Sequence, residues 1–205
     1  DRIKIYIGAV EESTKFTKTF VSRKSEELLR GLLELEVPEI YEEIIEIRNI
    51  AREAGSRSKV AVYSNDENLD VKGACIGRNG MRIQNIIDEL CGEKIDIVLW
   101  NEDITEFVKN ALNPAEVLSV EIIEEGEENM KVARVLVAEN QLSLAIGKKG
   151  QNSRLAARLC GVKIDIHTEP AEIDEFEEYE EDTAFNDSFE DEVEESAFAG
   201  LHEED

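Results

Sequence analysis

The sequence predicts an α+β protein built around a unit of about 70 residues that occurs twice. Two glycine pairs, Gly77–Gly80 and Gly147–Gly150, lie 70 residues apart, and a stretch of helical periodicity follows each pair. A Leu-Cys-Gly tripeptide ends each stretch, at residues 90–92 and 159–161, and the alternating segment Lys-Ile-Asp-Ile comes soon after it in both places. Matches that stay in register over this length indicate a duplicated fold.

Hydrophobic periodicity gives the order of elements within the unit. After the first glycine pair, Ile83, Ile86, Ile87 and Leu90 fall on one face of a helix, and Gly92 follows where a C-cap is expected. Residues 95–99 then alternate as in a half-buried strand. The β-prone runs that precede the helices in the two copies are residues 44–50, 59–64, 117–123 and 132–138, with turns at 54–57 and at Gly126.

A short helix opens each unit, and the second copy shows it clearly. Asp103 is a suitable N-cap, and Glu106 three residues later predicts a capping box. The predicted buried stripe of this helix is Ile104, Phe107, Val108, Ala111 and Leu112. The order of each unit is therefore helix, strand, strand, helix, Gly-x-x-Gly, helix, strand.

This order resembles the type II KH fold of bacterial RNA-binding proteins. Four segments, residues 37–40, 51–59, 73–77 and 147–152, are similar to the NusA family of transcription factors, and the resemblance covers roughly residues 1–168. It implies two tandem type II KH domains, preceded by a partial OB-barrel remnant with a helix and followed by a disordered acidic tail. The implied boundaries are 1–36 for the remnant and linker helix, 37–101 and 102–168 for the KH domains, and 169–205 for the tail.

The glycine loops are the candidate RNA-binding sites. An RNA backbone must approach protein amides closely, and glycine removes the Cβ that would stand in the way. The following helix N-terminus adds unpaired N–H groups, and KH domains clamp about four nucleotides of single strand at this loop. The candidate contacts are Ile76, Gly77, Arg78, Asn79, Gly80 and Arg82 in the first unit, and Ile146, Gly147, Lys148, Lys149, Gly150, Gln151, Asn152 and Arg154 in the second.

The charge distribution agrees with this interpretation, although the formal net charge of −25 argues against a nucleic-acid partner at first sight. Residues 169–205 hold 18 of the 48 acidic residues and no Lys or Arg, which leaves 30 acidic against 23 basic residues in 1–168. No Asp or Glu occurs in residues 71–87 or 140–164, which contain the two loops. A phosphate within a Debye length of about 8–10 Å therefore meets a basic surface.

A structural interpretation of the same residues stays open at this level. Each Gly-x-x-Gly could be only a tight connection between helices, with its basic residues forming a solvated face. Arg82, Arg154 and Arg158 could likewise be ordinary surface residues of a helix rather than phosphate ligands.

The two units are joined only by Asn101–Glu102, which is too short to act as a free tether. We therefore expect a fixed interface that makes the two grooves one extended RNA surface. Trp100 at this joint is expected to be an interface core residue rather than a base-stacking platform.

The two ends of the chain differ in character. Alternation over Ile3, Ile5 and Ile7 predicts a strand, residues 15–21 predict another, and Ser25 predicts the cap of a helix. The expected buried residues of that helix are Leu28, Leu29, Leu32, Leu33 and Leu35. The acidic tail is interpreted as a solubilising segment, or as an RNA mimic or partner-docking segment through its spaced aromatic residues.

The sequence shows no membrane-spanning run or signal peptide, and its three cysteines, expected to be reduced and buried, have no metal-ligand spacing. We expect a cytoplasmic, monomeric protein without cofactor or metal. The function implied is a non-enzymatic transcription elongation factor that binds single-stranded nascent RNA. Effects on pausing, termination and antitermination, and a contact with RNA polymerase, rest on the family resemblance alone.

Three other functions are compatible with KH domains. RNA-degrading phosphorylases also combine KH and OB modules, but in the opposite order and behind a large catalytic part. A ribosome-associated protein would bind structured RNA, and a KH pair could also act as a protein-docking platform. The Lys and Arg residues of the loops argue against the last alternative.

Overall fold

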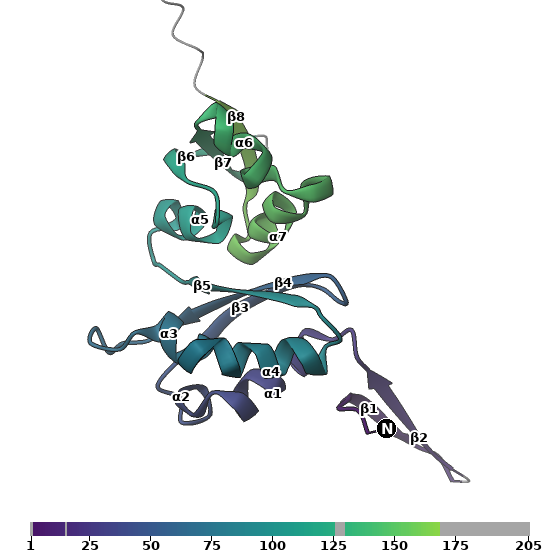
Figure 1. The fold of residues 1–205 in the computed structure, drawn as a ribbon. Helices are drawn as coiled ribbons and strands as arrows, with labels where there is room; N and C mark the ends of the chain where they lie inside the picture. The colour runs from purple at the N-terminus through teal and green to yellow at the C-terminus, as the bar shows by residue number, and fades with distance from the viewer. Residues whose placement is uncertain (1, 15, 126–129, 169–205) are drawn as a thin grey trace, which may run out of the picture. The chain divides into compact units, whose positions relative to one another are not determined.

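The structure, a computed structural model, describes residues 2–14, 16–125 and 130–168 of the 205-residue chain. An N-terminal hairpin is followed by two three-stranded sheets, each with helices packed on it (Figure 1). The predicted tail at 169–205 and the predicted turn at Gly126 lie outside the described residues. Within the described ranges, no helix has the length and apolar character needed to cross a membrane.

The first repeat has the predicted element order, with two helices rather than one before its first strand. Its elements are α1 (Glu26–Glu36), α2 (Pro38–Tyr41), β3 (Glu46–Glu53), β4 (Arg57–Tyr63), α3 (Val71–Ile76), α4 (Met81–Glu89) and β5 (Lys94–Leu99). The sheet order is β3-β4-β5, with β4 antiparallel to β3 and parallel to β5. The long connection through α3 and α4 is what allows β4 and β5 to run parallel.

The second repeat reproduces this topology. Its elements are α5 (Ile104–Leu112), β6 (Val117–Glu125), β7 (Met130–Val137), α6 (Glu139–Ile146), α7 (Gln151–Cys160) and β8 (Lys163–Thr168). The sheet order β6-β7-β8 has the same antiparallel and parallel pairings. Lys94 pairs with Arg57 and the equivalent Lys163 pairs with Val132, so the duplication seen in the sequence is confirmed in the register.

Helix α1 belongs to the core of the first repeat, although the sequence analysis groups it with the N-terminal segment. Ser25 caps it by accepting a hydrogen bond from the Glu27 amide, and Leu28, Leu29, Leu32 and Leu33 are buried against β3 and α4. The prediction for Leu35 was wrong, because its side chain is 69% exposed. Leu35 lies about a quarter turn from the centre of the face that the four buried leucines define.

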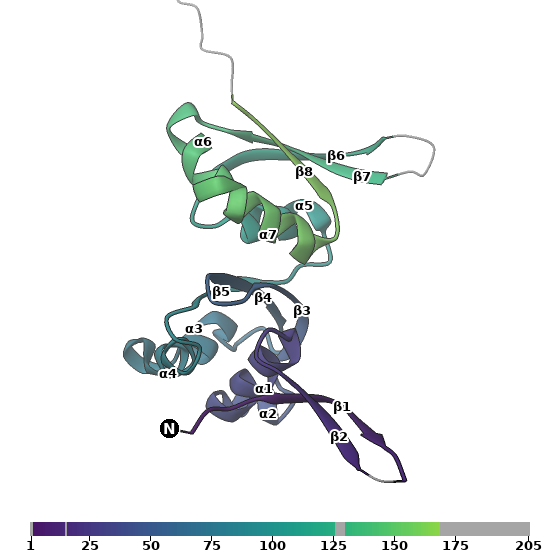
Figure 2. The same ribbon diagram turned by 90° about the vertical axis from the view of Figure 1, so that its right-hand side faces the viewer.

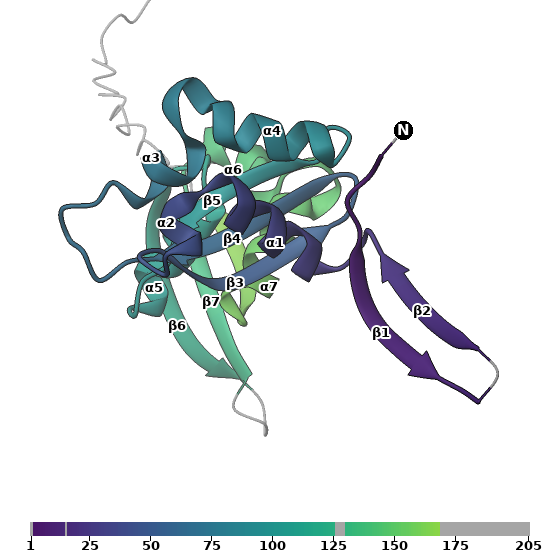
Figure 3. The same ribbon diagram turned by 90° about the horizontal axis from the view of Figure 1, so that it is seen from below.

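The N-terminal hairpin pairs β1 (Tyr6–Glu12) with β2 (Thr17–Ser22) in a separate two-stranded sheet (Figure 3). The first strand begins at Tyr6, so Ile3 and Ile5 precede it rather than lying within it as predicted. Arg23 fastens this segment to α4 through the Glu89 carboxylate at 3.2 Å and the Glu89 carbonyl at 2.7 Å. The hairpin therefore contacts the first repeat through polar bonds at the end of α4.

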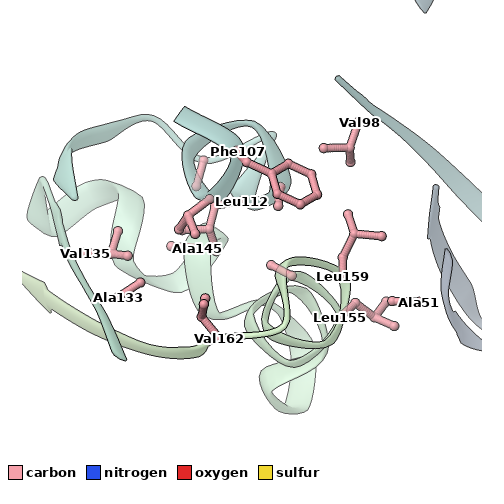
Figure 4. Packing of buried hydrophobic residues seen from close by; sticks show 14 of the residues in the cluster. Ala51, Val98, Phe107, Leu112, Ala133, Val135, Ala145, Leu155, Leu159 and Val162 are labelled. Carbon is pink, nitrogen blue, oxygen red and sulfur yellow. The ribbon is translucent and has the colours of Figure 1, made fainter. Parts of the chain in front are cut away.

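The sheet of the first repeat is covered on both faces. Helices α1, α3 and α4 pack on one face, and α5 and α7 of the second repeat pack on the other (Figures 1 and 2). Along β4 the side chains alternate between the two, since Val60 and Val62 join the first core and Ala61 joins the second. Ala51 and Val98 also belong to the second repeat's core, beside Leu155, Leu159 and Phe107 (Figure 4).

Two expectations concern the joint between the repeats. The expected interface core residue Trp100 is confirmed, because its ring packs on the second core and lies edge-on to Tyr63 with centroids 5.2 Å apart. Asp103 caps α5 by accepting hydrogen bonds from Thr105, as predicted, but the capping box was wrong. Glu106 pairs with Lys109 at 2.6 Å instead, and the Asp103 amide donates to the Asn101 side chain.

A buried ion pair stabilises the first sheet. The Glu93 carboxylate, fully buried, accepts hydrogen bonds from Arg52 at 2.8 and 2.9 Å, from the Gly55 amide at 2.8 Å and from the Ser58 hydroxyl at 2.6 Å. Burial raises the pKa of Glu93, but the hydrogen bonds from Arg52, Ser58 and Gly55 lower it further, so the pKa lies below its ordinary value. At the equivalent position the second repeat has the apolar Val162.

Replacing Glu93 by Gln should cost about 3–5 kcal/mol of unfolding free energy near pH 7, because the Arg52 charge is left buried without its partner. Because the folded pKa of Glu93 is depressed, its contribution is fully present above the unfolded value of about 4.3 and is lost as pH falls below it. Urea unfolding between pH 7 and 3 should therefore show a flatter acid limb for Glu93→Gln than for wild type. The exposed Glu42→Gln variant is the control and should keep the wild-type limb; identical limbs for all three proteins would contradict the assignment.

Candidate nucleic-acid interface

The two glycine loops have the same backbone conformation. Gly77 has φ and ψ of 77° and 170°, and Gly147 has 75° and 171°. A positive φ with an extended ψ is essentially restricted to glycine. The third and fourth loop residues are left-handed in both copies, with φ of 55° at Asn79 and Lys149 and 74° and 70° at Gly80 and Gly150. Each loop is thus a fixed corner between two helices, α3 and α4 in one repeat and α6 and α7 in the other (Figure 2).

The first glycine of each loop has no room for a side chain. A Cβ on Gly77 would lie 2.6 Å from Cγ of Arg82, and a Cβ on Gly147 would lie 2.8 Å from Cβ of Asn152. A Cβ on Gly80 would meet nothing within 4 Å. The first glycine is therefore required for packing as well as for its backbone angles.

The predicted loop side chains point outward. Arg78, Asn79, Lys148 and Lys149 are exposed, and so is Ile146, while Ile76 is half-buried. The backbone amides of Gly80 and Gly150 donate to the carbonyls of Gly77 and Gly147, at 3.0 and 3.1 Å. The loops therefore present their basic side chains to solvent on a short 3-10 turn that is already formed.

A groove of about 340 Å³ begins at the first loop and lies between α3 and β5. Its apolar lining comes from Ile76, Ile95, Ile97 and Val98, and its polar lining includes Arg57 and Lys72. Asn113 and Pro114 of the second repeat close one side. The groove is therefore shared by both repeats.

A cluster of ion pairs centred on Asp96 lines one part of this groove. Asp96 accepts hydrogen bonds from Arg57 at 2.7 and 2.9 Å and from Lys59 at 3.2 Å. Lys59 is fully buried and also donates to the Asn113 carbonyl; burial lowers its pKa. Burial raises the pKa of Asp96, but Arg57 and Lys59 lower it further, so the group stays an anion. With Lys72, the groove holds three cations against one carboxylate.

The second loop is tied to the turn between β3 and β4. Gln151, directly after the loop, donates to Glu53 at 2.8 Å and to the Ser56 hydroxyl at 2.7 Å. Arg154 pairs with the same Glu53 at 2.6 Å and donates to the Lys149 carbonyl at 3.2 Å. The hydrogen bond from Arg154 is the main reason that the pKa of Glu53 is lowered. These bonds connect the second loop to the first sheet.

Comparison with protein families settles which fold family this is. Residues 23–100 match the family model of a NusA-like first KH domain, and residues 104–174 match that of a NusA-like second KH domain. The chain belongs to the NusA-like KH proteins. Their first and second KH domains are the first and second repeats described above.

Curated relatives with the name transcription termination/antitermination protein NusA give the same assignment. The protein from Bacillus subtilis is 54% identical over 169 residues, which is 82% of this chain and 44% of the relative. The Thermus thermophilus protein is 53% identical over 177 residues, 86% of this chain and 44% of the relative. The chain therefore spans less than half the length of these NusA proteins.

A solved structure supports the fold alone. The crystal structure titled APE1850 superposes with a TM-score of 0.51 at 24% sequence identity, covering 68% of this chain and 96% of that one. At this identity the likeness shows a common arrangement of elements, and no residue role is transferred from it.

The structure places the predicted contact residues in three settings. The loop residues and Ile146 are accessible, and Ile76 lines the groove between the KH domains. Gln151 and Arg154 lie at the domain interface, bound to Glu53. Asn152 is buried beneath its loop with 4% exposure, whereas the Arg82 side chain is 32% exposed and pairs with Glu39.

The groove is also lined by residues that were not predicted from the sequence, among them Arg57, Lys72 and Asn113. Lys72 had a usable signal, since it lies in the acid-free window around the first loop. Asn113 had none, because its position depends on how the second KH domain docks on the first.

Substituting each of the two glycines of the first loop by alanine distinguishes the stability cost of lost packing space from the cost of backbone strain. Gly80→Ala should cost about 1 kcal/mol of unfolding free energy, from the left-handed backbone alone. Gly77→Ala should cost about 3 kcal/mol or more, since strain and the overlap with Arg82 add. Urea unfolding of the two variants checks this difference, and equal losses would show that Arg82 moves aside freely.

Proposed function

We propose that this chain binds single-stranded RNA through its two KH domains as the RNA-binding part of a transcription termination/antitermination factor. The observation that carries the proposal is the pair of loops with one backbone conformation, each presenting exposed cations at the start of a helix. Such a loop brings cationic side chains to the positive end of a helix dipole, which favours the binding of a phosphate.

Two neighbouring residues of the first domain, Ser56 and Arg57, lie near the second loop and in the groove beside the first loop. Ile76, next to the first loop, lines the groove whose polar wall includes Arg57. The neighbouring Ser56 is bonded to Gln151, the residue that follows the second loop. A strand of RNA leaving the first loop is proposed to follow this groove to the second, with its bases against the isoleucines and its phosphates near Lys72 and Arg57.

The proposed contacts follow from this path. Arg78 and Asn79, with Lys148 and Lys149, would bind phosphates through their exposed side chains. Ile76 and Ile146 would lie under bases. Gln151 and Arg154 are also proposed to contact RNA. Both side chains are hydrogen-bonded to Glu53, so RNA would compete with that carboxylate for them.

We assign the roles of the longer NusA proteins to this chain only as part of the proposal. Their name supports action in termination and antitermination on nascent RNA, and with it a contact to RNA polymerase. The exposed apolar side chains of the hairpin, among them Ile7, Phe16 and Val21, support its assignment as the end of an OB-type barrel. The same relatives support a binding rather than a catalytic role.

Replacing Arg78, Lys148 and Lys149 together by Ser tests the proposal. In a titration of fluorescent single-stranded RNA against salt, we expect at least about a hundredfold weaker binding in low salt. The slope of log K against log salt should fall by up to about 2, at roughly 0.7 per lost phosphate contact.

The control replaces three exposed lysines away from the loops, Lys18, Lys24 and Lys131, by Ser and so changes the net charge equally. Its affinity should stay within a fewfold of wild type. Equal losses in both variants would mean that only overall charge matters. Unchanged binding in both, with a preference for duplex RNA, would favour a structured-RNA protein, and no RNA binding by wild type would favour a protein-docking platform.

A further inference from the structure

The fifth residue after the first glycine of each loop differs in type between the repeats but has the same position. It is Arg82 in the first KH domain and Asn152 in the second, and each side chain lies directly against its glycine. Both residues were predicted from the sequence to contact RNA. Their geometry indicates another task.

Both side chains hold the end of the helix that precedes the loop. Arg82 donates to the Ala74 carbonyl at 2.7 Å, and Asn152 donates to the carbonyls of Ala145 at 3.1 Å and Leu144 at 3.4 Å. Ala74 and Leu144 are equivalent positions, 70 residues apart. Carbonyls in the last turn of a helix have no partner within the helix, so these bonds fix where the helix stops and the loop begins.

Both side chains also reach a helix that precedes the first strand of their own domain. Arg82 pairs with Glu39 of α2 at 2.9 Å, and Asn152 donates to the Leu112 carbonyl at the end of α5 at 2.9 Å. Each loop is thereby joined to two helices through one side chain. An ionic bond does this in one domain and a neutral amide does it in the other.

Asn152 is held by its donor atoms alone. Its Nδ2 serves three carbonyls, while its Oδ1 is buried and has no partner among the described residues. A buried acceptor without a partner costs free energy, so the donor contacts must outweigh that cost. Arginine, at the equivalent place, has donors only and leaves no such acceptor.

We propose that Arg82 and Asn152 are positioning residues, which hold the Gly-x-x-Gly backbone in its RNA-binding conformation and do not bind phosphate themselves. The inference rests on the proposed RNA function. Asn152 is uncharged and buried, so it adds nothing to the release of counterions by RNA. The Arg82 side chain is 32% exposed, but its guanidinium is already engaged by the Glu39 carboxylate and the Ala74 carbonyl.

The test compares Asn152→Ala with Val135→Ala in the full chain. Val135 is 1% exposed in the same domain core but belongs to β7, so its truncation lowers stability without touching the loop. At a temperature where both variants are fully folded, Asn152→Ala should bind single-stranded RNA about tenfold more weakly with an unchanged salt slope, an effect of ~1.4 kcal/mol. Val135→Ala should bind as wild type does.

The RNA-free proteins give a second readout. In NMR spectra, Asn152→Ala should shift the amide signals of Gly147 and Gly150, which Val135→Ala leaves in place. Wild-type affinity for Asn152→Ala, or an equal loss in Val135→Ala, overturns the inference. Failure of wild type to bind RNA would instead remove the proposed function, and the amide shifts would still decide whether Asn152 positions the loop.

The first domain supplies an independent variant should Asn152→Ala not fold. Arg82→Gln should shift the Gly77 and Gly80 amides and weaken RNA binding with no change of salt slope. A slope that falls by about 0.7, the value for one lost phosphate contact, would show that Arg82 is a phosphate ligand and overturn its positioning role.

Discussion

The packing of the first KH sheet between two sets of helices is the constraint on which the rest of this molecule depends. Ala51 and Ala61 are small enough to let α7 approach the sheet closely, and Val98 completes the contact. A sheet with one open face would need polar residues there. Because the second domain covers that face, Ala51, Ala61 and Val98 of the first domain belong to the hydrophobic core of the second.

Polar bonds at the edge of this core extend the same constraint to the loops. Asn49 donates to the Leu159 carbonyl, and Glu53 holds Gln151 and Arg154 beside the second loop. On the other side, Lys59 reaches the Asn113 carbonyl across the groove. The surface proposed for RNA is therefore built from both domains, and neither would present the whole of it alone.

Much of this arrangement follows from local patterns in the sequence. The duplicated element order, the glycine loops and the caps at Ser25 and Asp103 depend on residues close together in the chain, so their signals are readable. Partners distant in sequence gave no such signal. The pairs Arg52–Glu93 and Lys59–Asp96 join residues 41 and 37 positions apart, and nothing in their neighbours shows that they are buried.

The candidate site divides along the same line. Sequence spacing identifies the loop residues, because the glycines and the basic residues between them can be recognised without knowing which distant residues they contact. It does not reveal that Arg82 and Asn152 donate to backbone carbonyls, because those carbonyls lie at the ends of other helices. Nor does it show that the Glu106 carboxylate binds Lys109 rather than the backbone amide of Asp103, because both groups lie three residues away. The prediction that all three cysteines are buried was wrong for Cys91, which is exposed in the turn after α4.

The position of Trp100 has a practical consequence. It is the only tryptophan in the chain, and its ring lies between Tyr63 and Phe107 with the Arg48 guanidinium 5.1 Å from its centroid. Intrinsic emission excited at the indole band therefore comes from the junction of the two domains and from nowhere else in the chain. The unlabelled protein thus contains its own optical reporter of whether the domains stay together while either one is perturbed.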